Sequence, residues 1–164
     1  MSKINGKGGD RIAESEEVDM PGIIVGVDGS GHSRKALERA ITEAVAHHAP
    51  LTVLAVHQAV DDVYGLPSHY PDDAALTEKT QEAAQAEIEQ VLAASATRPE
   101  SVTVKAVHGL PVEELVNASS DADMLVLGSR GKGGFARLLL GSTASQVAHH
   151  ARCAVLIVPA AEDA

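Results

Sequence analysis

The residues best suited to chemistry in this chain lie between Gly128 and Ser142, in the run GSRGKGGFARLLLGS. An apolar stretch, 124–127, precedes this run, and a helix-compatible segment, 142–151, follows it. Glycines let a backbone approach a ligand closely, and the amides at a helix N-terminus favour anions. A glycine-rich loop between a strand and a helix therefore predicts a site that binds phosphate groups.

This loop is locally basic within an acidic protein. Arg130, Lys132 and Arg137 lie in it, whereas the chain of 164 residues carries a formal net charge of −10. A strongly negative protein repels nucleic acids, so we expect a single small anionic ligand and no nucleic-acid partner. Proteins that bind single strands also stack bases on aromatic side chains, and this chain has only three aromatic residues: Tyr64, Tyr70 and Phe135.

Two common phosphate-binding motifs do not fit this loop. The P-loop needs Gly-x4-Gly-Lys followed by Ser or Thr, and the chain contains no such run. A dinucleotide fingerprint can be aligned with Gly131, Gly133 and Ala136. That alignment would follow the fourth strand, however, and no acidic residue for a ribose stands about twenty residues further on. The match is therefore interpreted as accidental.

The elements that must position the loop alternate along the chain. Strands are predicted at 23–28, 51–56, 102–107, 123–128 and 154–158, and helices at 30–49, 75–96, 111–119 and 142–151. This alternation predicts an α/β fold with an open parallel sheet of five strands and helices on both faces. Ligands of such sheets bind beyond the carboxyl ends of the strands. Asp28 and Gly128 both stand at such ends, so we expect them to share one site.

The chain divides into a predicted disordered leader, residues 1–20, and a single domain, residues 21–164. The leader lacks the apolar core of a signal peptide, and no apolar run approaches the roughly 18 residues that span a bilayer. The single cysteine, Cys153, excludes an internal disulfide and is expected to be a buried, inert thiol. These features predict a cytoplasmic protein without a membrane partner. The long loop at 57–74 is either a lid or a bystander.

Taken together, several motifs make the chain resemble the universal stress protein family, in its ATP-binding branch. The resemblance covers residues 21–159, and its motifs include VGVDGS (25–30), DMLVLGSRG (123–131), LGSTASQV (140–147) and CAVLIVP (153–159). The family's ATP loop has the pattern Gly-x2-Gly-x9-Gly-Ser/Thr, and this chain keeps every position of it.

The resemblance implies the adenine-nucleotide α-hydrolase-like fold with strand order 3-2-1-4-5, ATP at the carboxyl edge, and homodimers. Edge-to-edge pairing of the last strand, Ala154–Val158, is the expected dimer contact, because this strand would be an open apolar edge in a monomer. By the resemblance Asp28 lies near the ribose and the backbone of Val56 meets the adenine. The predicted nucleotide-binding residues are Asp28, Gly29, Ser30, Val56, Gly128, Ser129, Arg130, Gly131, Gly133, Gly141, Ser142 and Thr143.

No catalytic residue is predicted, because the phosphate loop has no evident nucleophile with a neighbouring base. Slow hydrolysis could follow from Mg²⁺ and positioning alone, so the expected ligand is ATP, with or without Mg²⁺. The chain is therefore interpreted as a nucleotide-sensing regulatory dimer in a stress response. Two alternatives stay open. One is a slow ATPase or nucleotidyl transferase of related fold, although residues 29–32 (GSGH) lack the first histidine of the usual transferase signature. The other is a nucleotide-free dimeric scaffold.

The histidines do not predict a metal site. The adjacent pairs His47–His48 and His149–His150 point in different directions on a helix, and the chain has no His-x3-His spacing. Both pairs stand near helix carboxyl ends, where a protonated imidazole is favoured. His57 and His108 end predicted strands and are candidates for the edge of the cleft.

Overall fold

The computed structural model describes residues 22–58, 73–132 and 139–159. The predicted leader at 1–20, Gly133, Arg137, the three aromatic residues and most of the 57–74 loop lie outside these ranges. The elements follow in the order β1 (Gly22–Val27), α1 (Gly31–His47), β2 (Leu51–His57), α2 (Asp73–Ala94), β3 (Val102–His108), α3 (Pro111–Ala118), the short 3₁₀ helix η2 (Ser119–Asp121), β4 (Ala122–Gly128), α4 (Ser142–His150) and β5 (Ala154–Val158).

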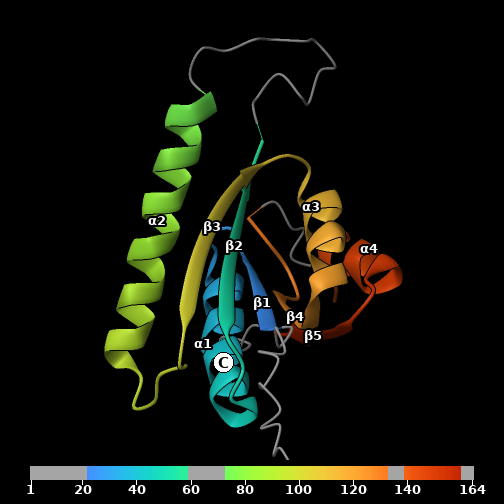
Figure 1. The fold of residues 1–164 in the computed structure, drawn as a ribbon. Helices are drawn as coiled ribbons and strands as arrows, with labels where there is room; N and C mark the ends of the chain where they lie inside the picture. Colours follow the sequence, from blue (N-terminus) through green and yellow to red (C-terminus); the bar gives the residue numbers. More distant parts are fainter. Residues whose placement is uncertain (1–21, 59–72, 133–138, 160–164) are drawn as a thin grey trace, which may run out of the picture.

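The five strands form one parallel sheet in the order β3-β2-β1-β4-β5 (Figure 1). This order confirms the predicted fold class. Val25 of β1 lies at the centre of the sheet, in register with Val53 of β2 and Val126 of β4, and all three are fully buried. Strands of this kind are buried on both faces, which is why their sequences are almost continuously apolar.

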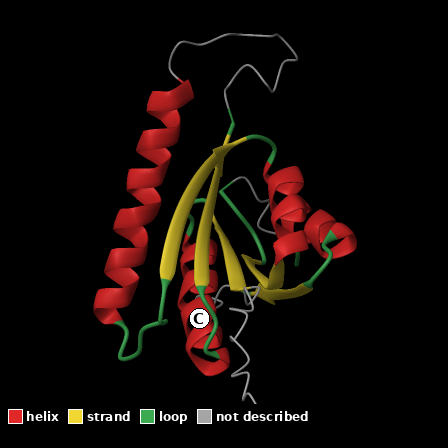
Figure 2. Cartoon of the chain, viewed as in Figure 1, coloured by secondary structure: helices red, strands yellow, loops and turns green. Residues whose placement is uncertain are grey.

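Helices cover both faces of the sheet (Figure 2). α1 and α2 pack on one face, over a core of Val, Ile, Leu and Ala side chains. α3 and α4 lie on the other face, over a smaller apolar cluster centred on Leu115, Leu125, Leu127 and Val147. The cavity described below lies on this second side, beneath α3.

The two edges of the sheet differ in polarity. β3 exposes Thr103 and Lys105, as the alternation in its sequence predicts for an edge strand. β5 presents no charged side chain and keeps four of its five residues partly exposed. A charged edge discourages pairing with another chain, whereas an apolar edge favours it.

The start of α1 is fixed by a side-chain cap next to the predicted site. Ser30 is the N-cap residue, and its hydroxyl accepts a hydrogen bond from the backbone amide of Ser33 at 3.1 Å. Gly29, just before it, turns the chain from β1 into α1 with a left-handed φ of 75°. The cap and the turn together set where Asp28 stands relative to the sheet.

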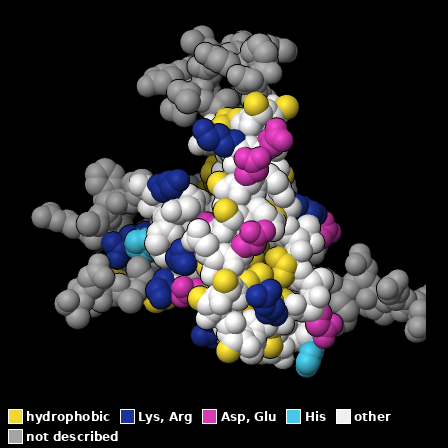
Figure 3. Space-filling model, turned by 90° about the vertical axis from the view of Figure 1, so that its left-hand side faces the viewer, with side chains coloured by type: hydrophobic (Ala, Val, Ile, Leu, Met, Phe, Trp, Pro, Cys, Tyr) yellow, Lys and Arg dark blue, Asp and Glu magenta, His cyan; other side chains and the backbone are white. Residues whose placement is uncertain are grey.

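The face of the molecule that carries α2 has a mixed charge. On the face that carries α2, acidic and basic side chains are interspersed and form no continuous basic surface (Figure 3). No helix within the described ranges combines the length and the apolar character needed to cross a membrane. Cys153 was expected to be buried, but its side chain is only half-buried. It stands directly before the edge strand β5.

Candidate functional site

A cavity of about 410 Å³ opens at the carboxyl ends of β1, β2 and β4. Its walls come from these strand ends, the loop after β4, and the first turns of α1, α3 and α4. This is the edge at which open parallel sheets bind ligands, where the winding direction reverses between β1 and β4. The lining residues are Gly26, Val27, Asp28, Ser33, Leu54, Val56, Gln58, Pro111, Leu115, Leu127, Gly128, Arg130, Gly131, Lys132, Gly141, Ser142, Thr143 and Ala144.

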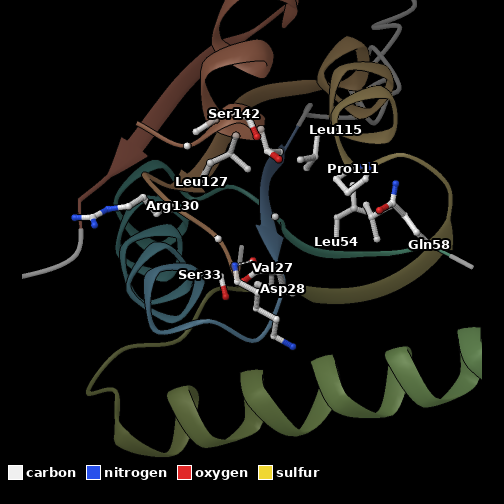
Figure 4. Close-up of a pocket in the computed structure, with 18 residues that line it drawn as sticks. Val27, Asp28, Ser33, Leu54, Gln58, Pro111, Leu115, Leu127, Arg130 and Ser142 are labelled. Atoms are coloured by element: carbon white, nitrogen blue, oxygen red, sulfur yellow. Dashed lines mark hydrogen bonds between the residues drawn. The ribbon is translucent and has the colours of Figure 1, made fainter. Parts of the chain in front are cut away.

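The cavity has two chemically different halves (Figure 4). One half is aliphatic, with Leu54, Pro111 and Leu115 grouped on one side of the view and Gln58 at its rim. The other half is polar, with the glycine-rich loop and Ser142 at the start of α4. Asp28 and Ser33 lie close to each other beside Val27 in this view, apart from both Ser142 and the aliphatic group. An elongated ligand with one apolar ring and one anionic end fits this division.

Asp28 connects the end of β1 to the loop after β4. One carboxylate oxygen, Oδ1, accepts the amide hydrogen of Ser30 at 2.9 Å, and the other, Oδ2, accepts that of Lys132 at 3.0 Å. These two strand ends are neighbours in the sheet although Asp28 and Lys132 are 104 positions apart in the sequence. The carboxylate therefore holds the glycine-rich loop in place before any ligand arrives.

The hydrogen bonds to Asp28 also set its ionisation. Partial burial alone would raise the pKa of this carboxyl. Hydrogen bonds from Ser30, Lys132 and Ser33 act in the opposite direction and prevail, so the pKa lies below its usual value of 3.8. Asp28 is therefore a carboxylate at neutral pH, and it would repel phosphates and accept hydrogen bonds from hydroxyl groups.

Two glycines of the loop are required by close packing within the protein itself. A Cβ atom on Gly131 would lie 2.6 Å from Oδ2 of Asp28. A Cβ atom on Gly128 would lie 2.8 Å from the backbone of His32, in the first turn of α1. Both contacts are shorter than van der Waals distance. The sequence predicts that these glycines let a ligand approach the backbone closely. In the structure they also let Asp28 and the start of α1 approach it closely.

The polar half ends at the N-terminus of α4. Gly141 is the N-cap residue and has no side chain to accept the first amides of the helix, and Ser142 and Thr143, the first two residues of α4, line the cavity. The amide of Gly141 donates to the carbonyl of Ser129 at 2.7 Å, and the amide of Ser129 donates to the carbonyl of Val158 at 2.8 Å. The first bond joins the two ends of the loop and the second holds its start on β5, so the start of α4 is fixed in a position that favours an anion.

The structure brings most of the predicted site residues to this one cavity. The predicted residues that line it are Asp28, Val56, Gly128, Arg130, Gly131, Gly141, Ser142 and Thr143. Gly29, Ser30 and Ser129 do not line it: they form the turn, the helix cap and the tie to β5 described above. Gly133 lies outside the described residues. The Arg130 side chain points away from Asp28 (Figure 4), so its guanidinium and Asp28 do not face each other.

Sequence reasoning missed the aliphatic half of the cavity and one basic residue. Gly26, Leu54, Gln58, Pro111 and Leu115 line it, and so does Lys132, which had been noted only as a loop charge. Pro111 and Leu115 belong to α3, which follows the edge strand β3 and returns over the middle of the sheet. The alternation in β2 could have indicated Leu54, because it shares a face with Val56.

The histidines at the strand ends do not line the cavity. His57 and His108 are paired in register at the ends of β2 and β3, as predicted. His57 is buried, and it bonds to Thr77 of α2 on the face of the sheet opposite the cavity. The expectation that these residues stand at the edge of the cleft is therefore wrong.

Comparison with known proteins accounts for this architecture. Residues 21–159 match the sequence model of the universal stress protein family. The chain belongs to the universal stress protein family. Among its relatives, a universal stress protein of Mycobacterium tuberculosis is 38% identical over 140 residues, which cover 84% of this chain and 47% of that protein. One from Thermus aquaticus is 32% identical over 138 residues, covering 83% of this chain and 96% of that protein.

Solved structures of the family have the same fold. UspA from Lactobacillus plantarum superposes with a TM-score of 0.64 at 26% identity, over 84% of this chain and 97% of that one. A universal stress protein solved in complex with cAMP gives a TM-score of 0.63 at 28% identity, over 84% and 96% of the two chains. The chain spans about half the length of the mycobacterial relatives that it matches, at 47% of the example above.

Proposed function

We propose that this universal stress protein binds ATP in the cavity at the carboxyl edge of its sheet and acts as a nucleotide-sensing regulatory dimer. One observation carries the proposal: a preorganised loop and the free amides of a helix N-terminus face an aliphatic slot across a single cavity of about 410 Å³. The similar protein solved with cAMP supports an adenine nucleotide as the ligand class.

Each part of the nucleotide has a suitable partner in this arrangement. The adenine ring would lie between the side chains of Leu54 and Leu115, with the backbone of Val56 at its edge. The ribose hydroxyls would donate hydrogen bonds to Asp28, whose carboxylate is the sole acidic group in the described lining. The phosphates would accept hydrogen bonds from the amides of Ser142 and Thr143, in the favourable field of the α4 N-terminus.

A magnesium ion would accompany the phosphates and would not occupy a protein-made site. Both oxygens of Asp28 already accept amide hydrogens, and the described lining offers no second carboxylate. Magnesium prefers oxygen ligands and commonly keeps several waters when it binds with a nucleotide. The hydroxyls of Ser142 and Thr143 are the residues here that could join such an ion.

The dimer would form by pairing of the β5 edges of two chains. β5 is bonded to β4 on one side, and among the described residues no other strand pairs with it. Val155 and Leu156 pack on the two sides of the sheet, whereas Ile157 is half-exposed and belongs to neither core cluster. A second copy of the strand would satisfy the backbone groups of this edge and cover Ile157.

We infer that the protein acts in the cytoplasm as a nucleotide sensor and does not hydrolyse nucleotide rapidly. A single cysteine fits a reducing compartment. No serine, threonine or aspartate in the described cavity lining hydrogen-bonds to a histidine. Slow ATP hydrolysis through positioning would be compatible with sensing, since a slow step lets the bound nucleotide persist.

The proposal is tested by the stability of the protein in the presence of nucleotides. At a concentration one hundred times the dissociation constant, ATP should raise the free energy of unfolding by about 2.7 kcal/mol. Measured by urea unfolding, this gain should shrink in a Ser142→Pro variant, which keeps the helix start but removes one amide. A matched Ser145→Ala change in the same helix, outside the cavity lining, should keep it. No gain with ATP, ADP or AMP would favour a nucleotide-free scaffold.

A further inference from the structure

A second group of polar side chains lies on the opposite face of the sheet from the nucleotide cavity. His57 and His108 end the neighbouring strands β2 and β3 and are direct partners in the register. Their ring centres are 5.4 Å apart, and the ring planes are tilted by 38°. Neither side chain lines the cavity, so the proposed nucleotide site does not account for this pair.

His57 has one engaged and one orphaned ring nitrogen. Its side chain is only 8% exposed, and Nε2 lies 2.8 Å from the hydroxyl oxygen of Thr77 in α2. Nδ1 is also buried and has no hydrogen-bond partner among the described residues. A buried polar atom without a partner is costly, and it indicates either a structural defect or a missing ligand.

We propose that His57 and His108 bind a divalent transition-metal ion of the zinc type. Imidazole nitrogen is a preferred ligand of such ions, with metal–nitrogen distances of about 2.0–2.1 Å. Two imidazoles that share one ion at these distances have ring centres roughly 5–6 Å apart, and the observed separation of 5.4 Å falls in this range. The separation of the two rings is therefore compatible with a shared ion.

Thr77 takes the place of the outer partner that orients a metal-binding histidine. When Nε2 of His57 donates its hydrogen to the Thr77 hydroxyl, Nδ1 carries the lone pair that a metal requires. The bond also fixes the plane of the ring relative to α2. Thr77 is thus a positioning residue for this site, and it does not itself contact the ion.

An ion would enter from the side of His108 and keep water ligands there. His108 is exposed, so the pair opens to solvent through that ring. Two protein ligands leave the remaining coordination positions to water, which makes this an exchangeable site and no structural zinc centre. Within the described residues no group of three or more His, Cys, Asp or Glu side chains could hold a metal ion, so the pair has no third protein ligand there.

The test is a zinc titration of the nucleotide-free protein, followed by NMR of the imidazole nitrogens labelled with ¹⁵N. We expect the resonances of His57 and His108 to move together, and Nδ1 of His57 to shift to the position of a metal-bound nitrogen. Magnesium should leave both rings unchanged, because it prefers oxygen ligands. Since no nucleotide is present, the outcome is independent of the proposed ATP site.

Variants separate this site from other histidines of the protein. His108→Ala, at an exposed position, should weaken zinc binding by about tenfold or more, whereas the matched change His150→Ala, at an exposed position in α4, should not. Thr77→Val keeps both imidazoles and should still weaken binding by roughly tenfold, because the tautomer of His57 is no longer fixed. Zinc shifts confined to other histidines, or affinity unchanged in His108→Ala, would overturn the proposal.

Discussion

Replacing Gly128 or Gly131 by alanine should separate the packing role of each loop glycine from its role in ligand binding. In Gly128→Ala, the new Cβ would meet the backbone of His32 at 2.8 Å, and this part of α1 cannot rotate away as a side-chain end can. Overpacking of this kind costs about 1–3 kcal/mol. The lower entropy of the unfolded alanine chain offsets about 0.4–1 kcal/mol. We therefore expect a net loss of about 1–2 kcal/mol in the free energy of unfolding.

Gly131→Ala should behave differently, because its Cβ would meet a side-chain atom. Oδ2 of Asp28, 2.6 Å away, can move, but the hydrogen bond from Lys132 would then break. A hydrogen bond at an exposed site contributes about 1 kcal/mol, which the entropy gain of alanine nearly cancels. Stability should change little, while ATP affinity should fall by roughly tenfold as the loop loses its anchor.

The assay for both variants is urea unfolding with the slope held equal to that of the wild type. Gly31→Ala is the matched control, because its Cβ would have no atom within 4 Å and the residue lies in the same first turn of α1. This control should be as stable as the wild type or more so. A Gly128→Ala variant as stable as Gly31→Ala would refute the predicted clash with His32. The predicted contact between Gly131 and Asp28 would be refuted if Gly131→Ala changed the free energy of unfolding equally in the wild type and in an Asp28→Ala background.

Three further outcomes follow from the structure. Because the pKa of Asp28 is lowered from 3.8, its carboxylate adds stability that is present above this pH and is lost as the pH falls through the lower folded value. The stability difference between wild type and Asp28→Asn, measured by urea unfolding, should therefore shrink below pH 3.8; a constant difference would contradict this. Burial raises the pKa of the Cys153 thiol, and the negative charge of Asp123 raises it further. A backbone hydrogen bond from Leu125 lowers this pKa, but the raising effects prevail. Alkylation by iodoacetamide at neutral pH, followed by mass spectrometry, should be several-fold slower than for a free cysteine, and an equal rate would refute it. Ile157→Lys should give a monomer in sedimentation velocity while the wild type is a dimer, and a dimeric variant would exclude the β5 contact.

The elements of the fold were predictable from local patterns. Apolar runs, the cap at Ser30 and the proline at the start of α3 mark strands and helices within a few residues of their observed bounds. The strand order was implied only by family resemblance, because pairing between parallel strands far apart in the chain leaves no local signal. The pairing of Asp28 with Gly128 at one edge followed from topology alone.

The finer geometry of the site was not predictable, because it depends on contacts between distant segments. The bond from Lys132 to Asp28 joins residues 104 positions apart, and nothing in either neighbourhood indicates it. Leu115 reaches the cavity only because α3 returns over the sheet from its edge strand. His57 alternates with the apolar residues of β2, and this period could have placed it on the α2 face.

The proposed phosphate site is tested most directly by the response of the backbone amides to the phosphate groups of ATP. Two-dimensional NMR spectra of the ¹⁵N-labelled protein would be compared with saturating adenosine and with saturating ATP. We expect the amides of Ser142, Thr143 and Gly131 to shift with ATP and not with adenosine, since these residues line the polar half of the cavity. Amides that respond equally to both ligands, or to neither, would contradict a phosphate site at the start of α4.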